Sequence, residues 1–273
     1  MSTEQFKGSR AAPEPGTPLI ELRQLGKNFS GVQALKDGNL KLYPREIHAL
    51  VGGNGAGKST IVNILSGNYH PEVGQIFLNG KEITIDSPKR ARELGIATIY
   101  QNLSLVDTLD VTSNLFLGQE RKLPGPLGLL GFLNHREMQR EAVSEFKRLG
   151  INIPNVKSKV ARMSGGQRQA IACARVLCSK NPQLLIMDEP TAALGVRETA
   201  EIYDLMFRCR DEGASVLLIS HNMEDVFKVA DRITVLRLGE TVAQVRKQEV
   251  DSTQIVGLIT GAIEQLQPAH SPA

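Results

Sequence analysis

The sequence predicts an α/β protein with a mainly parallel sheet, and three observations indicate this fold class. An apolar segment at 46–51 leads directly into a glycine-rich turn and then into a helix expected at 58–66. A second apolar segment, at 184–187, ends in two carboxylates, Asp188 and Glu189. From there to residue 237, apolar strands alternate with helical patterns, as in proteins whose parallel strands are joined by helices.

The remaining elements follow from short apolar runs and their boundaries. We expect strands at 19–25, 39–43, 47–51, 75–78, 81–83, 96–100, 184–187, 215–219 and 233–237. We expect helices at 87–95, 136–149, 198–212, 223–230 and 252–266, the last with Ile255, Ile259 and Ile263 spaced four apart. Residues 103–165 are expected to form a helical subdomain inserted into the sheet domain.

The domain organisation is expected to be simple. Only one glycine-rich nucleotide-type loop occurs in the 273 residues, so we expect a single domain over residues 19–261. Residues 1–18 are rich in Pro, Gly, Glu and Ser without periodicity, which predicts a disordered tail, and residues 262–273 are expected to be a second tail.

The glycine-rich turn at 52–59 has the pattern G-x-x-x-x-G-K-[ST] and is preceded by a strand and followed by a helix, as a phosphate-binding loop requires. Backbone N–H groups of such a loop surround phosphates, and the positive end of the helix dipole points at them. We expect Lys58 on the β- and γ-phosphates of ATP or GTP and Ser59 on Mg²⁺. The nucleotide-binding residues are then Gly52, Gly53, Asn54, Gly55, Ala56, Gly57, Lys58, Ser59 and Thr60.

The acidic pair that ends the apolar run at 184–187 fits the metal side of the same site. We expect Asp188 to hold Mg²⁺ through water and Glu189 to polarise the attacking water. An acidic pair after a strand can also be structural or a helix cap. The preceding phosphate loop makes the catalytic interpretation the better one. His221 follows the strand expected at 215–219, which places its imidazole near the γ-phosphate.

A second helix N-terminus is suited to an anion. Ser164, Gly165, Gly166 and Gln167 precede a helix of small and apolar residues, so backbone N–H groups open at its first turn. One γ-phosphate cannot be held by two distant loops of one subunit. We therefore expect a partner chain to supply the second loop.

Composition limits the other function classes. Thirty-two basic and 29 acidic residues give a net charge of +3, which does not favour a nucleic-acid partner. The three cysteines form no C-x-x-C pair, so neither a zinc site nor a disulfide framework is expected. No apolar run reaches the length of a membrane span, and no signal peptide is expected at the N-terminus.

The order of these motifs, with Gln101 between the first loop and the Ser-Gly-Gly-Gln loop, resembles the ATP-binding-cassette ATPases over residues 19–261. Segments 28–35, 99–106, 114–118 and 189–196 look most like ATPase subunits of bacterial sugar importers of the ribose, xylose and fructose type. This resemblance implies a P-loop NTPase core, an antiparallel β subdomain over the nucleotide base and an inserted helical subdomain. It also implies ATP and Mg²⁺ as ligands.

The resemblance adds site residues and partners. Phe29 takes the place of an aromatic side chain that stacks on adenine, and Gln101 senses the nucleotide through Mg²⁺ or the attacking water. Two copies are expected to close head to tail over two ATP molecules. Membrane permease subunits and an extracytoplasmic sugar-binding protein complete such an importer, which places this chain peripherally on the cytoplasmic face of the inner membrane.

One departure from the family pattern concerns the loop after the acidic pair. Most cassettes carry an Asp where this chain has Gly195, so the contact that this Asp makes across the dimer is not assured.

Two segments of the inserted region carry further expectations. Residues 105–117 are expected to present a partly apolar surface to a permease, the alternative being a subdomain that packs on itself. The apolar run at 123–133 contains Pro and Gly residues, and we expect a packed loop rather than a surface that touches a membrane or a permease.

Two functional alternatives are weighed at this point. A P-loop kinase or GTPase is disfavoured, because it has no use for the Ser-Gly-Gly-Gln loop and should show an acceptor-binding or guanine-reading segment. Cassette ATPases without a transporter act in DNA repair or translation. Such proteins have long coiled coils, or two cassettes with arms, and this sequence has neither feature.

Overall fold

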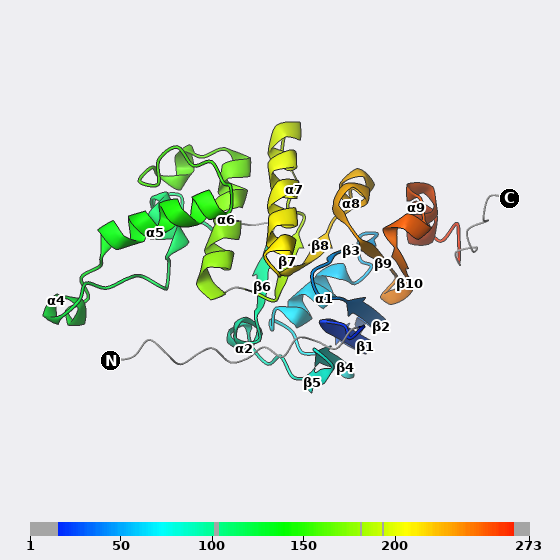
Figure 1. Cartoon of the computed structure of the whole chain (residues 1–273). Helices are drawn as coiled ribbons and strands as arrows, with labels where there is room; N and C mark the ends of the chain where they lie inside the picture. Colours follow the sequence, from blue (N-terminus) through cyan, green and yellow to red (C-terminus); the bar gives the residue numbers. More distant parts are fainter. Residues whose placement is uncertain (1–15, 101–103, 181, 193, 265–273) are drawn as a thin grey trace.

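The computed structural model describes residues 16–100, 104–180, 182–192 and 194–264. Its framework is one ten-stranded sheet with the strand order β5-β4-β1-β2-β10-β9-β3-β8-β7-β6. Helices cover this sheet, and a helical region extends from one end of the molecule (Figure 1). The predicted α/β fold class is confirmed.

Half of the sheet is parallel and buried. Its strands are β9 (Arg232–Arg237), β3 (Ile47–Gly52), β8 (Ser215–Ile219), β7 (Leu184–Asp188) and β6 (Ile96–Ile99), and each neighbouring pair runs parallel. Every residue of β3 and β8 is buried, as expected for strands covered on both faces. All five strands therefore end at the same edge of the sheet.

The other half is antiparallel, except that β10 and β2 pair in parallel through Glu240 and Asp37, and it is larger than predicted. It contains β1 (Ile20–Phe29), β2 (Val32–Leu42), β4 (Val73–Leu78), β5 (Lys81–Ile83) and β10 (Glu240–Arg246). The strands expected at 19–25 and 39–43 are parts of one long hairpin, β1–β2. Strand β10 was not predicted, because its residues are mostly half-buried and its pattern lacks a continuous apolar face.

The helices flanking the sheet are α1 (Lys58–Leu65), α2 (Pro88–Glu93), α6 (Gly165–Lys180), α7 (Val196–Asp211), α8 (Met223–Val229) and α9 (Ser252–Thr260). The helix expected at 252–266 is shorter than predicted. It ends at Thr260 because Gly261 adopts a left-handed conformation with φ of 83° and turns the chain back. Ile263 then packs against the cluster that contains Ile255.

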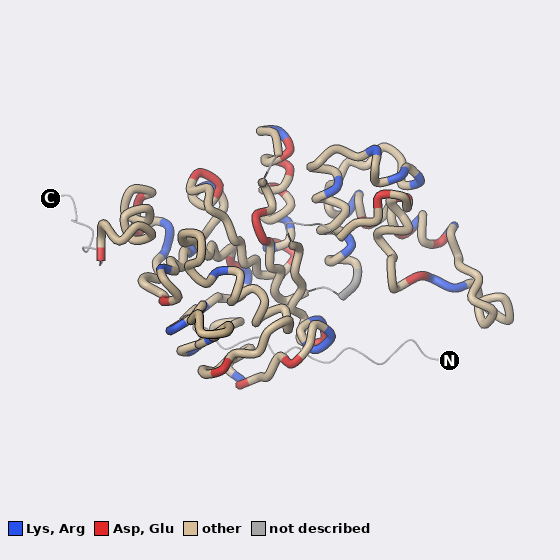
Figure 2. The backbone as a smooth tube through the Cα atoms, turned by 180° about the vertical axis from the view of Figure 1, so that it is seen from behind, with Lys and Arg blue, Asp and Glu red and all other residues tan. Residues whose placement is uncertain are grey.

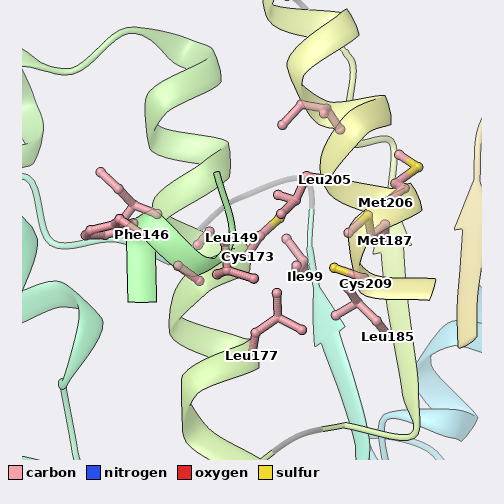
Figure 3. Packing of buried hydrophobic residues seen from close by; sticks show 14 of the residues in the cluster. Ile99, Phe146, Leu149, Cys173, Leu177, Leu185, Met187, Leu205, Met206 and Cys209 are labelled. Carbon is pink, nitrogen blue, oxygen red and sulfur yellow. The ribbon is translucent and has the colours of Figure 1, made fainter. Parts of the chain in front are cut away.

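The inserted region lies between β6 and α6 and contains α3 (Val111–Leu115), α4 (Pro126–Leu129), α5 (His135–Arg148) and a 3₁₀ turn at Val160–Arg162. Its core is continuous with that of α6 and α7. Figure 3 shows Phe146 and Leu149 beside Cys173 and Leu177, with Leu205 and Cys209 on the opposite side. This packing joins the inserted region to the sheet domain through α6.

One expectation about the inserted region is met only in part, and another is wrong. Within 105–117, Val111 and Phe116 are buried, whereas Val106 and Leu117 are 38% and 42% exposed, so a partly apolar surface is present and its contact with a permease stays a prediction. The run at 123–133 is not a packed loop, because Leu129 and Leu130 are exposed. The sequence alone could not assign these faces, since α3 and α4 are too short for a helical period to be read.

Several expectations remain outside what the structure tests. The predicted tails coincide largely with residues 1–15 and 265–273, and Gln101 also lies outside the described residues. The boundaries at 18, 103, 165 and 261 stay predictions. Among the helices that the structure describes, none combines the length and the apolar character needed to cross a bilayer.

Candidate nucleotide site

The predicted site residues are brought together by the parallel strands. In the sheet, Ile219 at the end of β8 is paired with Leu50 of β3 on one side and with Asp188 of β7 on the other. The loop at 52–59, the acidic pair and His221 thus follow three adjacent strands at their carboxyl ends. This is the edge where α/β proteins bind ligands.

The loop at 52–59 is held tightly against its neighbours. Gly239 donates a hydrogen bond from its backbone to the carbonyl of Ala56 (3.1 Å). Gly57 caps α1 with φ of 104°, and a Cβ placed there would lie 2.9 Å from the carbonyl oxygen of Ala34. A larger residue at position 57 would therefore be strained and would collide with backbone.

The first turn of α1 lacks the side-chain cap that most of the other helices have, a lack that it shares with α4 and its N-cap Gly125. Side chains cap α2, α3, α5, α8 and α9, whereas the N-cap of α1 is a glycine and its first turn contains no acidic residue. The leading N–H groups of α1 therefore have no side-chain acceptor at the N-cap. This arrangement suits a phosphate.

Lys58 is bent back onto the loop that precedes it. Its Nζ donates to the carbonyl oxygens of Gly52 (2.6 Å) and Gly53 (2.9 Å). Burial lowers the pKa of Lys58, and the charges of Glu189 and Asp188 oppose this shift. The ammonium group is thus placed between the loop and the acidic pair, where a phosphate needs a cation.

The two acidic residues have different surroundings. Asp188 is half-buried, and its burial, followed by the nearby charge of Glu189, raises the pKa of its carboxyl. Glu189 has the left-handed φ of 50°, which is uncommon for a residue with a side chain and is found at functional sites. Its backbone N–H donates to the carbonyl of Ile219 (2.9 Å), so this strained residue is fixed to the end of β8.

Glu189 and His221 form a direct contact. The Oε1 atom of Glu189 lies 2.8 Å from Nδ1 of His221, and the Glu189 side chain is 17% exposed while that of His221 is 74% exposed. The histidine is therefore not a buried core residue. It stands at the surface in contact with the Glu189 carboxylate, and its predicted place near the γ-phosphate stays a prediction.

Sequence reasoning missed Asp225, which ties two loops of the site together. Its carboxylate accepts hydrogen bonds from the hydroxyls of Thr191 (2.5 Å) and Tyr203 (2.5 Å) and from the side-chain amide of Asn222 (3.0 Å). Burial and this same carboxylate raise the pKa of Tyr203. In the sequence, Asp225 is indistinguishable from an ordinary acid in the first turn of a helix.

The loop at 163–167 forms the second predicted helix N-terminus. Ser164 Oγ accepts from the N–H of Gln167 (3.3 Å), and Gln167 Oε1 accepts from the N–H of Ser164 (3.1 Å). This reciprocal pair is a capping box. Ser164 and Gly165 are exposed, so the loop is presented to the outside.

Glu198 is a second residue that sequence reasoning missed. A Cβ on Gly166 would lie 2.9 Å from Cβ of Glu198, so the glycine permits this close packing. The Oε2 atom of Glu198 accepts from the N–H of Gly195 (3.2 Å). The Ser164 hydroxyl, and then the amides of Gly195 and Gly166, lower the pKa of the Glu198 carboxyl. An acid is thus present beside Gly195 after all, three residues later in the chain.

Phe29 lies at the end of β1 and is half-buried. Its ring centroid is 5.0 Å from that of Tyr69, at an interplanar angle of 66°. The side chain is therefore accessible to a further ring, unlike a core phenylalanine. Its assignment to the nucleotide base remains a prediction.

Relatives of known function resemble the chain over most of its length. The Fructose import ATP-binding protein FrcA of Rhizobium meliloti is 41% identical over 249 residues, which are 90% of this chain and 95% of the relative. The Xylose/arabinose import ATP-binding protein XylG of Sulfolobus acidocaldarius is 39% identical and covers 89% and 94%. The Ribose import ATP-binding protein RbsA 2 of Escherichia coli O157:H7 is 40% identical, and the chain spans about half of its length (47%).

Solved structures have the same fold. The structure of cbiO1 from Clostridium perfringens, part of the ABC transporter complex cbiONQ, has a TM-score of 0.72 at 27% identity and covers 90% of this chain and 95% of the other. An ATP-binding cassette of an ABC transporter in its ADP conformation has a TM-score of 0.74 at 24% identity, with 89% and 95% covered. The second likeness concerns the fold alone.

The sequence pattern of the family described as "ABC transporter" matches residues 35–192. This segment contains the loop at 52–59, the loop at 163–167 and the acidic pair, which are the groups assembled here. The chain belongs to the ABC transporter family and is an ATPase of the ABC type.

Proposed function

We propose that this chain is the ATP-hydrolysing subunit of a sugar importer. The observation that carries the proposal is the convergence at one sheet edge of an uncapped phosphate loop, Lys58 and the Glu189–His221 pair. Such an edge can bind a nucleoside triphosphate and activate a water beside it. The relatives named above are import ATP-binding proteins for fructose, ribose and xylose or arabinose, which supports a monosaccharide as cargo.

The oxygen donors at this edge fit a magnesium ion. The Ser59 hydroxyl lies at the exposed start of α1, and the Asp188 carboxylate ends β7, two strands from β3. Hydroxyl, carboxylate and phosphate oxygens are the ligands that Mg²⁺ prefers. When bound, the ion neutralises charge on the β- and γ-phosphates. Gln101 is a further proposed ligand.

In the reaction, the residues of this chain position the phosphates of ATP and polarise the attacking water. Lys58 moves its ammonium from the loop carbonyls to phosphate oxygens, because an ammonium bonds more strongly to an anionic oxygen than to a neutral carbonyl. His221 holds Oε1 of Glu189, so we assign the other carboxylate oxygen to the attacking water. Glu189 thereby orients the water and accepts its proton while the water oxygen bonds to the γ-phosphorus and ADP leaves.

We propose a homodimer with two shared sites. The exposed loop at 163–167 has a serine hydroxyl and a helix N-terminus suited to an anion, but it belongs to the inserted region rather than to the sheet edge. A second copy that faces the first head to tail would place this loop on the γ-phosphate bound at Lys58. ATP then closes the dimer, and hydrolysis opens it.

The contact with the permease subunits is proposed at a groove beside the inserted region. Pro88 and Arg92 of α2, Thr98 of β6 and Leu117 line it, so both the sheet domain and the inserted region contribute. A permease helix bound in this groove would contact both parts, so it would be displaced when the sheet domain and the inserted region move relative to each other. Leu117, the last residue of the surface predicted at 105–117, belongs to this groove, whereas Val111 and Phe116 of the same segment are buried. An extracytoplasmic sugar-binding protein would act through the assembled transporter, and no nucleic acid is expected.

An uptake experiment tests the cargo. In a strain that lacks this chain, uptake of labelled pentoses and hexoses is measured after complementation with wild type, Glu189→Gln or the control Glu82→Gln, on the edge strand β5. We expect uptake of one sugar to return with wild type and the control only. If no sugar depends on the chain although it hydrolyses ATP, the importer assignment is wrong and a cassette acting in repair or translation becomes the better interpretation.

A further inference from the structure

Residues 123–133 form an exposed apolar projection, which we call the knob. Four of its large side chains are exposed: Leu127 (52%), Leu129 (91%), Leu130 (74%) and Phe132 (55%). The knob contains α4 and projects from the end of the inserted region that is farthest from α9 (Figure 1). Single exposed leucines are ordinary, whereas four such side chains within six residues mark an interaction surface.

The knob is a folded unit with its backbone hydrogen bonds made internally. The N–H groups of residues 128 to 132 all donate to carbonyls of residues 125 to 128. Leu123 N–H also donates to the carbonyl of Phe132 (2.9 Å), which closes the knob at its base. A Cβ at Gly128 would lie 1.8 Å from the carbonyl oxygen of Leu123, so this close packing needs glycine.

Charges are arranged around the knob and not on it. Between residues 119 and 140 there are four basic and two acidic residues, and none of the six lies within 123–133. Figure 2 shows an uncharged tip with both basic and acidic residues at its base. Arg121 is paired with Glu141 (3.2 Å), whereas Lys122 has no ion pair among the described residues. With Glu141, the partner of Arg121, included, these charges sum to +1, so the base of the knob is slightly cationic and Lys122 is an unpaired cation there among the described residues.

We propose that the knob inserts into the interface of an anionic lipid bilayer and fixes the inserted region beside the membrane. Exposed leucine and phenylalanine side chains gain by leaving water for the acyl boundary, and flanking cations are attracted to anionic headgroups. The internal hydrogen bonds of residues 128–132 remove the penalty that free N–H groups would have in lipid. The inference goes beyond ATP hydrolysis and sugar cargo and does not require a permease at the contact.

Two features favour a lipid bilayer over a protein partner for this surface: the basic residues at its base and the internal hydrogen bonds of its backbone N–H groups. A protein interface commonly uses polar backbone or side-chain groups at its rim to fix orientation, and the tip of the knob offers almost only apolar side chains. A bilayer needs no such pattern. Its anionic headgroups also complement Lys122 and the basic residues at the start of α5.

Vesicle sedimentation tests the proposal with the full chain and without nucleotide. We expect the wild type to sediment with vesicles of phosphatidylcholine and phosphatidylglycerol, more weakly with phosphatidylcholine alone. The double variant Leu129→Gln/Leu130→Gln should bind at least about tenfold more weakly, because two exposed leucines are removed. Lys122→Gln should reduce binding to the anionic vesicles about fivefold and leave binding to neutral vesicles unchanged.

The matched control is Val143→Gln/Val256→Gln, which replaces two exposed valines elsewhere on the surface, on α5 and α9. It should bind like the wild type, and the basal ATPase activity of both double variants should be normal. The proposal is overturned if the wild type does not sediment, or if the knob variant sediments as well as the control. It is also overturned if light scattering without lipid shows the wild type self-associating through the knob. Since the assay needs no nucleotide, its failure would leave the ATPase assignment intact.

Discussion

The two helix N-termini proposed to enclose the γ-phosphate differ in how they are prepared for it. The first turn of α1 has a glycine N-cap, no acid and the ammonium of Lys58 nearby. The first turn of α6 is capped by its own Ser164 and Gln167, and the Glu198 carboxylate is packed against Gly166. The first loop is thus set to bind a phosphate by itself. The second loop already has the Glu198 carboxylate beside it. We therefore expect it to bind a phosphate only when the partner subunit presents a nucleotide held by its own first loop.

The strongest test of the first loop separates binding from chemistry. Glu189→Gln should keep ATP affinity, because the phosphates are held by the loop and Lys58, while turnover falls about 10²–10⁴-fold. Turnover is measured by phosphate release and affinity by calorimetry. Glu82→Gln serves as the control and should match wild type. A Glu189→Gln protein that hydrolyses ATP at a near-normal rate would remove this carboxylate from the reaction.

The second test asks whether the two loops act on one phosphate. Lys58→Ala and Ser164→Arg should each be nearly inactive alone. Mixed in equal amounts, random pairing leaves one intact site in half of the dimers, so about a quarter of the wild-type rate should return. The ratio dependence of ATP hydrolysis is the measurement. No recovery at any ratio, in a mixture proven to contain heterodimers, would contradict the shared site.

A third prediction concerns Phe29, which is proposed to contact the adenine base of the nucleotide held by the first loop. Phe29→Ala should weaken ATP binding about fivefold, because an aromatic contact of roughly 1 kcal/mol is lost. Phe29→Tyr should bind normally, and GTP affinity provides a further comparison. Equal affinity of the Ala variant and the wild type would return Phe29 to a packing role with Tyr69.

The smallest expected effect comes from removing the charge of Glu198, and it tests whether this carboxylate opposes phosphate binding at the second loop. Glu198→Gln keeps the side-chain packing against Gly166 and removes the charge, so ATP-driven dimer formation should increase about two- to threefold. The factor is modest because the carboxylate is exposed to solvent and its charge is screened. Glu201→Gln, on the same helix, is the control. Weaker dimer formation in Glu198→Gln would mean that the charge supports the loop rather than opposing the phosphate.

Much of the first loop and of the sheet edge could be predicted because both depend on local rules. A glycine pattern after an apolar strand predicts the loop, and parallel strands bring the residues after them to one edge. Lys58, Asp188, Glu189 and His221 are recognisable from the sequence alone for this reason.

What could not be predicted depends on contacts between distant segments. Asp225 is recognisable only when Thr191 and Tyr203 are seen to share its carboxylate, and Glu198 only when Gly166 is seen beneath it. Strand β10 exists through its pairing with β9 rather than through its own pattern. The knob was expected to be buried because apolar residues usually are, and no rule of spacing signals that a short apolar turn will stand in solvent.

The position of β3 in the sheet has a consequence for how the protein is made. Ile47 is paired with Val216 and Ala49 with Ile233, so both neighbours of the loop-bearing strand come from the last third of the chain. The β1–β2 hairpin pairs residues that leave the ribosome almost together. During synthesis the antiparallel layer can therefore form early, whereas the phosphate loop has no lateral support until translation is nearly complete. A nascent chain interrupted before residue 216 would carry the whole loop sequence and still lack the strands that hold the loop in shape.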